Sequence, residues 1–256
     1  MTQLEFMNAL RTEEIRRILE RHDNLFVGKD LLEIGSGTGA QLRELSRVCK
    51  SAIGIEIADS EYAADRLVEI LEYDGSHIPF PDASFDLIFS SNVIEHIRNE
   101  KTIHSEMHRV LRPGGVCVHI VPTAAWRLFA SIAHYPSLAK KIADKLLEFK
   151  RHTVTGNTGI DRTPVTLARW RAQLLYALVQ RRHGEFGNWF TEHFLFRRSA
   201  WQKRFEANGW RVEAIDSMGL AHSGYCLLGE RLSWRLRGWL ADIIGSSEVL
   251  IVLRQR

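Results

Sequence analysis

Short apolar runs alternate with amphipathic segments through the first half of the chain. Residues 4–21 carry apolar side chains near helical spacing, which predicts a helix. Short apolar runs over 30–34, 51–57, 84–90 and 116–121 predict buried strands, and helices are expected over 40–49, 60–71 and 95–110. Regular alternation of strand and helix favours an α/β fold with a doubly wound, mostly parallel sheet.

This alternation stops at Pro122. Helices are predicted over 126–151, 164–182, 199–208 and 229–244, and two further strands over 210–216 and 248–253. The chain therefore divides into a core over 1–121, a helical insertion over 122–198, and a C-terminal part of the core over 199–256. The last part carries one extra amphipathic helix.

The composition of the chain is that of a globular protein with reduced cysteines. The 256 residues are 45% hydrophobic and 25% charged, which suits a packed core. No run of eighteen apolar residues occurs and the start lacks the order of a signal peptide, so a cytoplasmic location is expected. The cysteines are far apart in sequence, which argues for reduced thiols and against a disulfide framework or a zinc motif. They are Cys49, Cys117 and Cys226.

The net charge of +3 hides two unlike halves. Residues 1–125 sum to −7 and residues 126–256 to +10, and all seven tryptophans lie between Trp126 and Trp239. Such a split indicates that the two halves do different jobs.

A glycine-rich loop over 35–39 follows the first predicted strand and precedes a helix. Glycines let the backbone approach a ligand closely, and a helix N-terminus offers unpaired N–H groups. Gly35, Gly37 and Ala40, with Glu56 at the right distance, also fit the dinucleotide fingerprint, so the loop alone leaves a nicotinamide cofactor open. Glu33 favours a different ligand, because its carboxylate would repel a pyrophosphate but suits an amino group.

Four motifs occur in order: LLEIGSGTG at 31–39, GIEIA at 54–58, DGSHIPFPDASFDLIFSSNVIEH at 74–96 and RVLRPGG at 109–115. Over residues 28–121 the chain resembles the class I S-adenosylmethionine-dependent methyltransferases, in the branch of the ubiquinone and menaquinone biosynthesis enzymes. The resemblance implies a seven-stranded Rossmann-like sheet, S-adenosyl-L-methionine as cofactor, and the insertion as an acceptor-binding cover.

The resemblance also implies which residues bind the cofactor. Glu33 would lie near its ammonium group, Glu56 would accept hydrogen bonds from both ribose hydroxyls, and Asp74 would accept one from the adenine amino group. The full predicted set is Glu33, Gly35, Ser36, Gly37, Thr38, Gly39, Glu56, Ile57, Asp74, Gly75, Ser76, Ser91 and Asn92.

Methyl transfer to oxygen benefits from a general base, and imidazole suits neutral pH. Among eleven histidines, His96 follows Glu95 in a family motif, and His193 precedes the 199–208 helix, where relatives return substrate-facing residues. These two are the predicted catalytic residues. No pair of His or Cys at metal-ligand spacing stands out, so no metal is predicted.

The second half determines the acceptor. Its aromatic residues could line an apolar pocket or form the insertion's own core. The helix within 228–244 carries an apolar stripe, including Leu236, Trp239 and Ile243, beside Arg231, Arg235 and Arg237. That stripe could pack on the sheet or make peripheral contact with the inner face of a membrane.

The leading interpretation is O-methylation of a small-molecule, glycan or lipid-like acceptor. A non-catalytic S-adenosylmethionine-binding protein, an NAD-dependent oxidoreductase and an RNA methyltransferase are the alternatives. Nucleic acid is disfavoured, because the basic residues are scattered and no RNA-binding module is recognised. The oligomeric state is left open.

Overall fold

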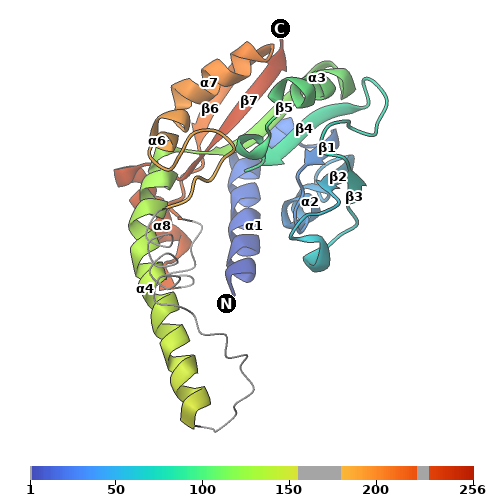
Figure 1. Ribbon diagram of the computed structural model, residues 1–256. Helices are drawn as coiled ribbons and strands as arrows, with labels where there is room; N and C mark the ends of the chain where they lie inside the picture. The colour runs from blue at the N-terminus through green and yellow to red at the C-terminus, as the bar shows by residue number, and fades with distance from the viewer. Residues whose placement is uncertain (1, 155–179, 224–230) are drawn as a thin grey trace.

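The computed structural model describes residues 2–154, 180–223 and 231–256, which form one seven-stranded sheet flanked by helices (Figure 1). The strand order is β3-β2-β1-β4-β5-β7-β6; the first five strands in this order are parallel, and β7 runs antiparallel to both neighbours. The predicted α/β fold with a mostly parallel sheet is therefore confirmed. The strands are β1 (Asp30–Ile34), β2 (Ser51–Ile57), β3 (Leu71–Tyr73), β4 (Phe85–Ser91), β5 (Leu111–Pro122), β6 (Trp210–Ser217) and β7 (Glu248–Gln255).

Seven α-helices and three short 3₁₀ turns belong to the described ranges. The helices are α1 (Gln3–His22), α2 (Ala40–Leu45), α3 (Glu100–Val110), α4 (Ala124–Val154), α6 (Glu192–Leu195), α7 (Arg198–Ala207) and α8 (Trp234–Ile244). The 3₁₀ turns are Asp23–Leu25, Ala63–Asp65 and Ile94–His96. None of the helices in these ranges is long and apolar enough to cross a membrane.

The strands alternate their side chains between two hydrophobic layers, as a pleated backbone requires. Leu31, Leu87 and Phe89 pack against α1 and α2 on one face, whereas Leu32 and Ile88 pack against α3, α4 and α7 on the other. Because both faces are covered, the central strands are mostly apolar, with exceptions such as Glu33 in β1 and Asp86 in β4. This explains why continuous apolar runs located the strands in the sequence.

The helix predicted over 60–71 is wrong. Only Ala63–Asp65 forms a single 3₁₀ turn, and Leu71 begins edge strand β3, where it pairs with Ile55. The Leu67 amide donates to the carbonyl of Thr38 at 2.8 Å, so tertiary contacts hold this segment across the glycine loop against its helical propensity. The helix predicted over 95–110 begins later, at Glu100, and most of the predicted 164–182 helix lies outside the described residues.

The apolar stripe of α8 is only partly buried, since Leu232 and Leu240 are half-buried and three other members are exposed. Leu236, Trp239 and Ile243 are 41%, 57% and 61% exposed. Arg237 is buried instead: its guanidinium donates to the carbonyls of Leu232 and Ala221, each at 3.1 Å, and lies over the Phe6 ring. The guanidinium therefore faces inward with Ala241 and Trp234, whereas Leu236, Trp239 and Ile243 face outward.

Candidate active site

A cavity of about 680 Å³ opens where β1, β2 and β4 end at their carboxyl edges. β1 lies between β2 and β4, so the cavity is at the point where strand order reverses, the usual ligand site of open α/β sheets. Its volume lies within the range of small-molecule and cofactor pockets. Residues from α1, the glycine loop, the end of β2, the 75–76 loop and the 91–99 segment line it.

The glycine loop forms the floor of this cavity. Gly35 and Gly37 have positive φ angles of 72° and 54°, which favour glycine. A Cβ on Gly35 would lie 2.3 Å from the side chain of Val93, so a larger residue at position 35 would have to displace Val93. The loop is further fixed by Glu56, whose carboxylate accepts hydrogen bonds from the amides of Gly37 at 2.8 Å and Ile57 at 2.9 Å.

Glu33 is buried beneath the loop. Its carboxyl oxygen Oε2 has no hydrogen-bond partner, and burial, assisted by the nearby charge of Glu56, raises the pKa of Glu33 to about 8. An unpartnered buried carboxyl oxygen is costly, so a cationic or hydrogen-bond-donating ligand would stabilise this position. A ligand with an amino group fits that requirement.

Most predicted cofactor residues line the cavity. Those that do are Gly35, Ser36, Gly37, Thr38, Glu56, Ile57, Gly75, Ser76, Ser91 and Asn92. Gly39 instead occupies the N-cap of α2, and Glu33 lies below the surface. Their roles toward a cofactor stay predictions.

Asp74 does not line the cavity, although its neighbours do. It is exposed, and its Oδ1 accepts hydrogen bonds from the amides of Ser76 and His77, each at 2.7 Å. These backbone donors hold the pKa of Asp74 below its usual value. In this arrangement the carboxylate organises the 75–76 loop, and Gly75 and Ser76 are the groups that this loop presents to the cavity.

The two predicted catalytic histidines have different surroundings. His96 lines the cavity, whereas His193 does not. The adjacent residue on α6, Glu192, points inward and accepts hydrogen bonds from the backbone amides of His183 and Gly184. Successive side chains on a helix point about 100° apart, so His193 points in a different direction. His193 therefore lies half-buried away from the cavity.

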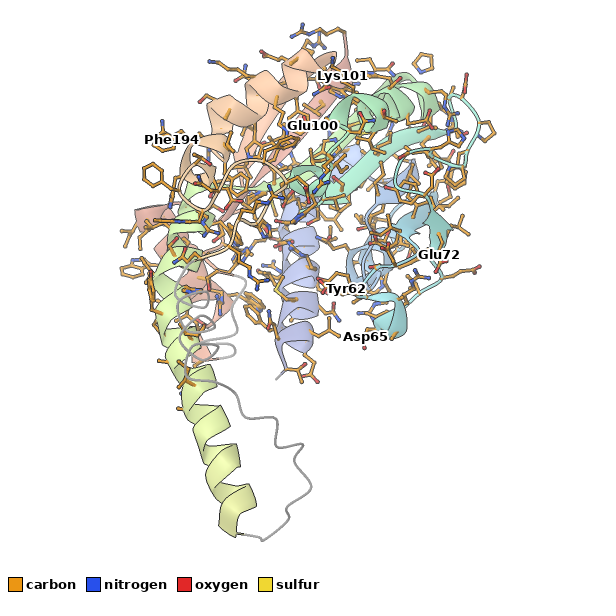
Figure 2. All side chains as sticks on the ribbon, viewed as in Figure 1. Tyr62, Asp65, Glu72, Glu100, Lys101 and Phe194 are labelled. Carbon is orange, nitrogen blue, oxygen red and sulfur yellow. The ribbon has the colours of Figure 1, made fainter. Side chains whose placement is uncertain are left out.

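Helix α1 forms a cavity wall that motif reasoning missed. Asn8 and Arg11 line it, and the Asn8 amide oxygen accepts from the Thr38 hydroxyl at 2.8 Å. Tyr62 lies beside the 3₁₀ turn that follows β2 and also lines the cavity (Figure 2). The amphipathic pattern of α1 signals a packed helix but not a ligand-facing surface.

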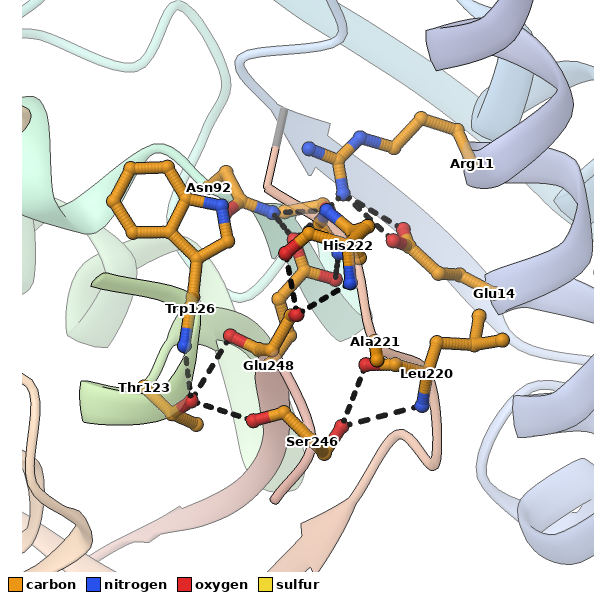
Figure 3. A network of polar contacts seen from close by, with 12 residues as sticks. Arg11, Glu14, Asn92, Thr123, Trp126, Leu220, Ala221, His222, Ser246 and Glu248 are labelled. Carbon is orange, nitrogen blue, oxygen red and sulfur yellow. Dashed lines mark hydrogen bonds and ion pairs between the residues drawn. The ribbon is translucent and has the colours of Figure 1, made fainter. Parts of the chain in front are cut away.

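A buried polar network connects α1 to the start of β7 at one side of the cavity (Figure 3). The Arg11 guanidinium donates to both Glu14 oxygens at 2.8 and 2.9 Å and to Glu248 at 3.1 Å. Asn92 donates to Glu248 at 2.8 Å, and the His222 Nε2 lies 3.5 Å from the second Glu248 oxygen. Within the part of the chain that the structure describes, neither ring nitrogen of His222 has a hydrogen-bond partner.

The pKa values of the two carboxyl groups in this network, Glu14 and Glu248, are shifted in opposite directions. Burial, together with the nearby charge of Glu248, raises the pKa of Glu14 against the effect of Arg11. Burial would also raise the pKa of Glu248, but the charge of the Arg11 guanidinium overcomes it and holds that pKa well below its usual range. One guanidinium therefore stabilises an ionised Glu248 at the cavity wall.

A second cluster lies on the wall around Trp126. Glu95 and His96 come from the 3₁₀ turn after β4, and His183 comes from the segment before α6. The His183 ring packs 4.3 Å from Trp126 and 4.7 Å from His96, centroid to centroid. Burial lowers the pKa of His96. Sequence spacing could not indicate this cluster, because His183 is distant along the chain.

The aromatic residues of the insertion behave differently from one another. Trp126 is buried and lines the cavity, whereas Tyr135, Trp189 and Phe190 are 54%, 41% and 56% exposed. Phe194, on the outer side of α6, is also exposed (Figure 2). Trp170 and Tyr176 lie outside the described residues. Most of the described aromatic side chains of the insertion are therefore exposed and do not form a core of their own.

Comparison with known families gives a match over the first half of the chain. Residues 32–119 match a family model described as a methyltransferase domain. A protein of Mycolicibacterium smegmatis named a probable S-adenosylmethionine-dependent methyltransferase is 33% identical over 109 residues, which is 41% of this chain and 42% of that protein. An uncharacterized methyltransferase of Mycobacterium tuberculosis strain H37Rv is 29% identical over 189 residues, 68% of this chain and 73% of that one.

The matched segment thus spans about two fifths of the length of the first of these relatives. Among solved structures, a SAM-dependent methyltransferase from Aquifex aeolicus aligns with 99% of this chain and 98% of its own, at a TM-score of 0.52 and 13% identity. At that identity the likeness concerns the fold alone, and it extends beyond the segment matched in sequence.

Proposed function

We propose that this chain, which belongs to the class I S-adenosylmethionine-dependent methyltransferases, transfers a methyl group to an oxygen atom of a small-molecule, glycan or lipid-like acceptor. The cofactor is S-adenosylmethionine. The observation that carries the proposal is a single cavity in which the glycine loop and Glu56 face Trp126 and the histidines. One part offers groups for a cofactor, and the other offers groups for an acceptor.

The chemistry of the cofactor suits the groups at the loop. Glu33 would hold the ammonium group, because its buried oxygen has no other partner. Glu56 would accept from the ribose hydroxyls, since each of its oxygens has capacity beyond the one amide it already accepts. The quinone-biosynthesis branch of the family stays a prediction.

The bound cofactor supplies an activated methyl group, so the chain's task is to align the acceptor and exclude water. In the transfer, a C–O bond forms, the C–S bond breaks with its electron pair on sulfur, and the acceptor hydroxyl loses a proton. His222 is the residue best placed to take that proton, since both ring nitrogens lack partners and the ionised Glu248 would stabilise the imidazolium. His96 stays a second candidate.

The outer face of α8 supports a lipid-like acceptor. Leu236, Trp239 and Ile243 are exposed beside Arg231 and Arg235, a combination typical of helices that lie on anionic membranes. We expect the protein to float with vesicles containing anionic lipid at low salt, and Trp239→Asp to reduce the floated fraction several-fold. Wild-type protein that stays unbound at low salt would contradict membrane contact, and leaves methyl transfer untouched.

Substitution of Glu56 tests the cofactor half of the proposal. We expect Glu56→Ala to weaken binding of S-adenosylhomocysteine by about 1.5–3 kcal/mol, the usual worth of a hydrogen bond to a charged group, as measured by calorimetry. Glu72→Ala is the matched control, because Glu72 pairs in register with Glu56 on exposed edge strand β3 (Figure 2). Equal affinities for Glu56→Ala and wild type would show that the ribose lies elsewhere.

A further inference from the structure

We propose that Glu95, His96 and His183 bind a divalent transition-metal ion at the wall of the cavity. One carboxylate oxygen and two imidazole nitrogens, one from each residue, all lie within 4.8 Å of one another. His96 and His183 line the cavity, so a bound ion would face it. The sequence predicts no metal, because two of the ligands are neighbours and the third is far along the chain.

Glu95 is the strongest reason to expect a cation. Its side chain is fully buried, and neither carboxylate oxygen has a hydrogen-bond partner among the described residues. The neighbouring carboxylates are neutralised: Glu185 pairs with Arg98 at 2.7 Å and Glu192 with Arg127 at 3.3 Å. Among the ion pairs of the described residues, Glu95 is paired with imidazoles alone, and a buried carboxylate without a compensating charge is expensive.

The distances in the cluster fit shared coordination better than direct hydrogen bonds. The Glu95 Oε1 lies 3.5 Å from the His183 Nε2 and 3.9 Å from the His96 Nε2. A charge-assisted hydrogen bond would be about 2.7–2.9 Å. Two ligands of one tetrahedral metal, each about 2.0–2.2 Å from it, stand about 3.3–3.6 Å apart. The Glu95–His183 distance already falls in this range, and the Glu95–His96 distance exceeds it by about 0.3 Å.

The backbone holds these ligands in place before any ion binds. The Glu185 amide donates to the Glu95 carbonyl at 2.8 Å, and a Cβ on Gly184 would lie 2.9 Å from that same carbonyl oxygen. Glycine at 184 therefore permits the close approach that brings His183 to Glu95. Trp126 packs against the His183 ring and restricts its orientation. Preorganisation of this kind favours metal binding.

A second grouping of possible ligands, Glu14, His222 and Glu248, is not an equivalent candidate. The Arg11 guanidinium already contacts both of its carboxylates. The positive charge that this grouping needs is already supplied by Arg11. Glu95, in contrast, is paired with no arginine or lysine among the ion pairs of the described residues.

Two histidines and one carboxylate suit Zn²⁺, Mn²⁺, Co²⁺ or Fe²⁺, and three protein ligands leave a position open for another molecule. An acceptor with adjacent oxygen atoms could occupy that position. The cation would lower the pKa of a hydroxyl that it contacts and fix its orientation. This role rests on the proposed function, whereas metal binding itself does not.

Cobalt titration of the full chain tests the site. After removal of metal with a chelator, the wild type should bind one Co²⁺ per chain, detected by visible ligand-field absorption and by elemental analysis. Glu95→Gln and His183→Ala should each weaken binding more than about 100-fold, since loss of a ligand should exceed the effect of losing an outer-shell partner. His77→Ala is the control, because His77 pairs with Glu106 at the surface. Its Co²⁺ affinity should equal that of the wild type.

Thermal unfolding shows that the variants are folded: Co²⁺ should raise the Tm of the wild type but not that of Glu95→Gln. Wild-type protein without bound Co²⁺, or Glu95→Gln with undiminished affinity, overturns the inference. The cofactor is titrated separately. If the chain binds S-adenosylhomocysteine but not Co²⁺, only the metal site is contradicted. If it binds Co²⁺ but not S-adenosylhomocysteine, only the proposed function is contradicted.

Discussion

Arg11→Met should lower the free energy of unfolding by about 3–5 kcal/mol, the usual cost of removing one partner from a buried ion pair. Arg11 contacts Glu14 and Glu248, whose side chains are 0% and 1% exposed. Without the guanidinium, the ionised Glu248 must bury a charge that Arg11 no longer compensates, or take up a proton. Urea unfolding with an unchanged m-value measures the loss.

Arg16→Met is the matched control on the same helix. Arg16 is 52% exposed and pairs with Glu13 and Glu20, so its removal should cost no more than about 1 kcal/mol. Glu248→Gln in the Arg11→Met background should recover part of the lost stability, because it removes the charge that Arg11 compensates. If Arg11→Met and Arg16→Met were equally stable, the network around Glu248 would not hold α1 against β7.

Glu33 should make stability depend on pH. Its pKa is raised from 4.5 to about 8 in the folded chain, so between these values the unfolded state has lost a proton that the folded state keeps. Stability from this group is therefore fully present below about pH 4.5 and is lost as the pH rises toward 8, by about 1.4 kcal/mol per unit.

Glu33→Gln should remove this slope. Compared with the wild type, the variant should gain stability steadily from pH 5 to 8, by roughly 3–4 kcal/mol in all, measured by urea unfolding at each pH. Glu69→Gln, at an exposed position, should leave the wild-type slope unchanged. Parallel pH profiles for wild type and Glu33→Gln would show that the buried carboxyl titrates normally.

The ligand adds a second readout for Glu33. An ammonium group held against its carboxyl favours the ionised form, so binding of S-adenosylhomocysteine near pH 7 should release a proton. Calorimetry in two buffers of different ionisation enthalpy measures this release, which Glu33→Gln should abolish.

The sheet and the glycine loop could be predicted from sequence because their signals are local. Strands buried on both faces require continuous apolar runs, and the loop requires glycines at positive φ at Gly35 and Gly37. The acid near the end of β2 was also predictable, since Glu56 is the penultimate residue of an apolar strand. These features all depend on neighbours along the chain.

Features that depend on tertiary contacts could not be read from the pattern. The 60–71 segment has helical spacing, yet contacts with the glycine loop and β2 give it a different structure. Arg237 looked like a solvated flank and is buried. His183 and His222 reach the cavity from distant segments, and nothing in their local sequence distinguishes them from the other histidines.

Titration of the wild type with S-adenosylhomocysteine and with NAD⁺ tests the central claim most directly. The structure presents a carboxylate and an unpartnered buried acid where a pyrophosphate would be repelled and an ammonium group stabilised. We expect one S-adenosylhomocysteine to bind per chain and NAD⁺ to produce no heat of binding at the same concentrations. Saturable binding of NAD⁺ without binding of S-adenosylhomocysteine would contradict the account.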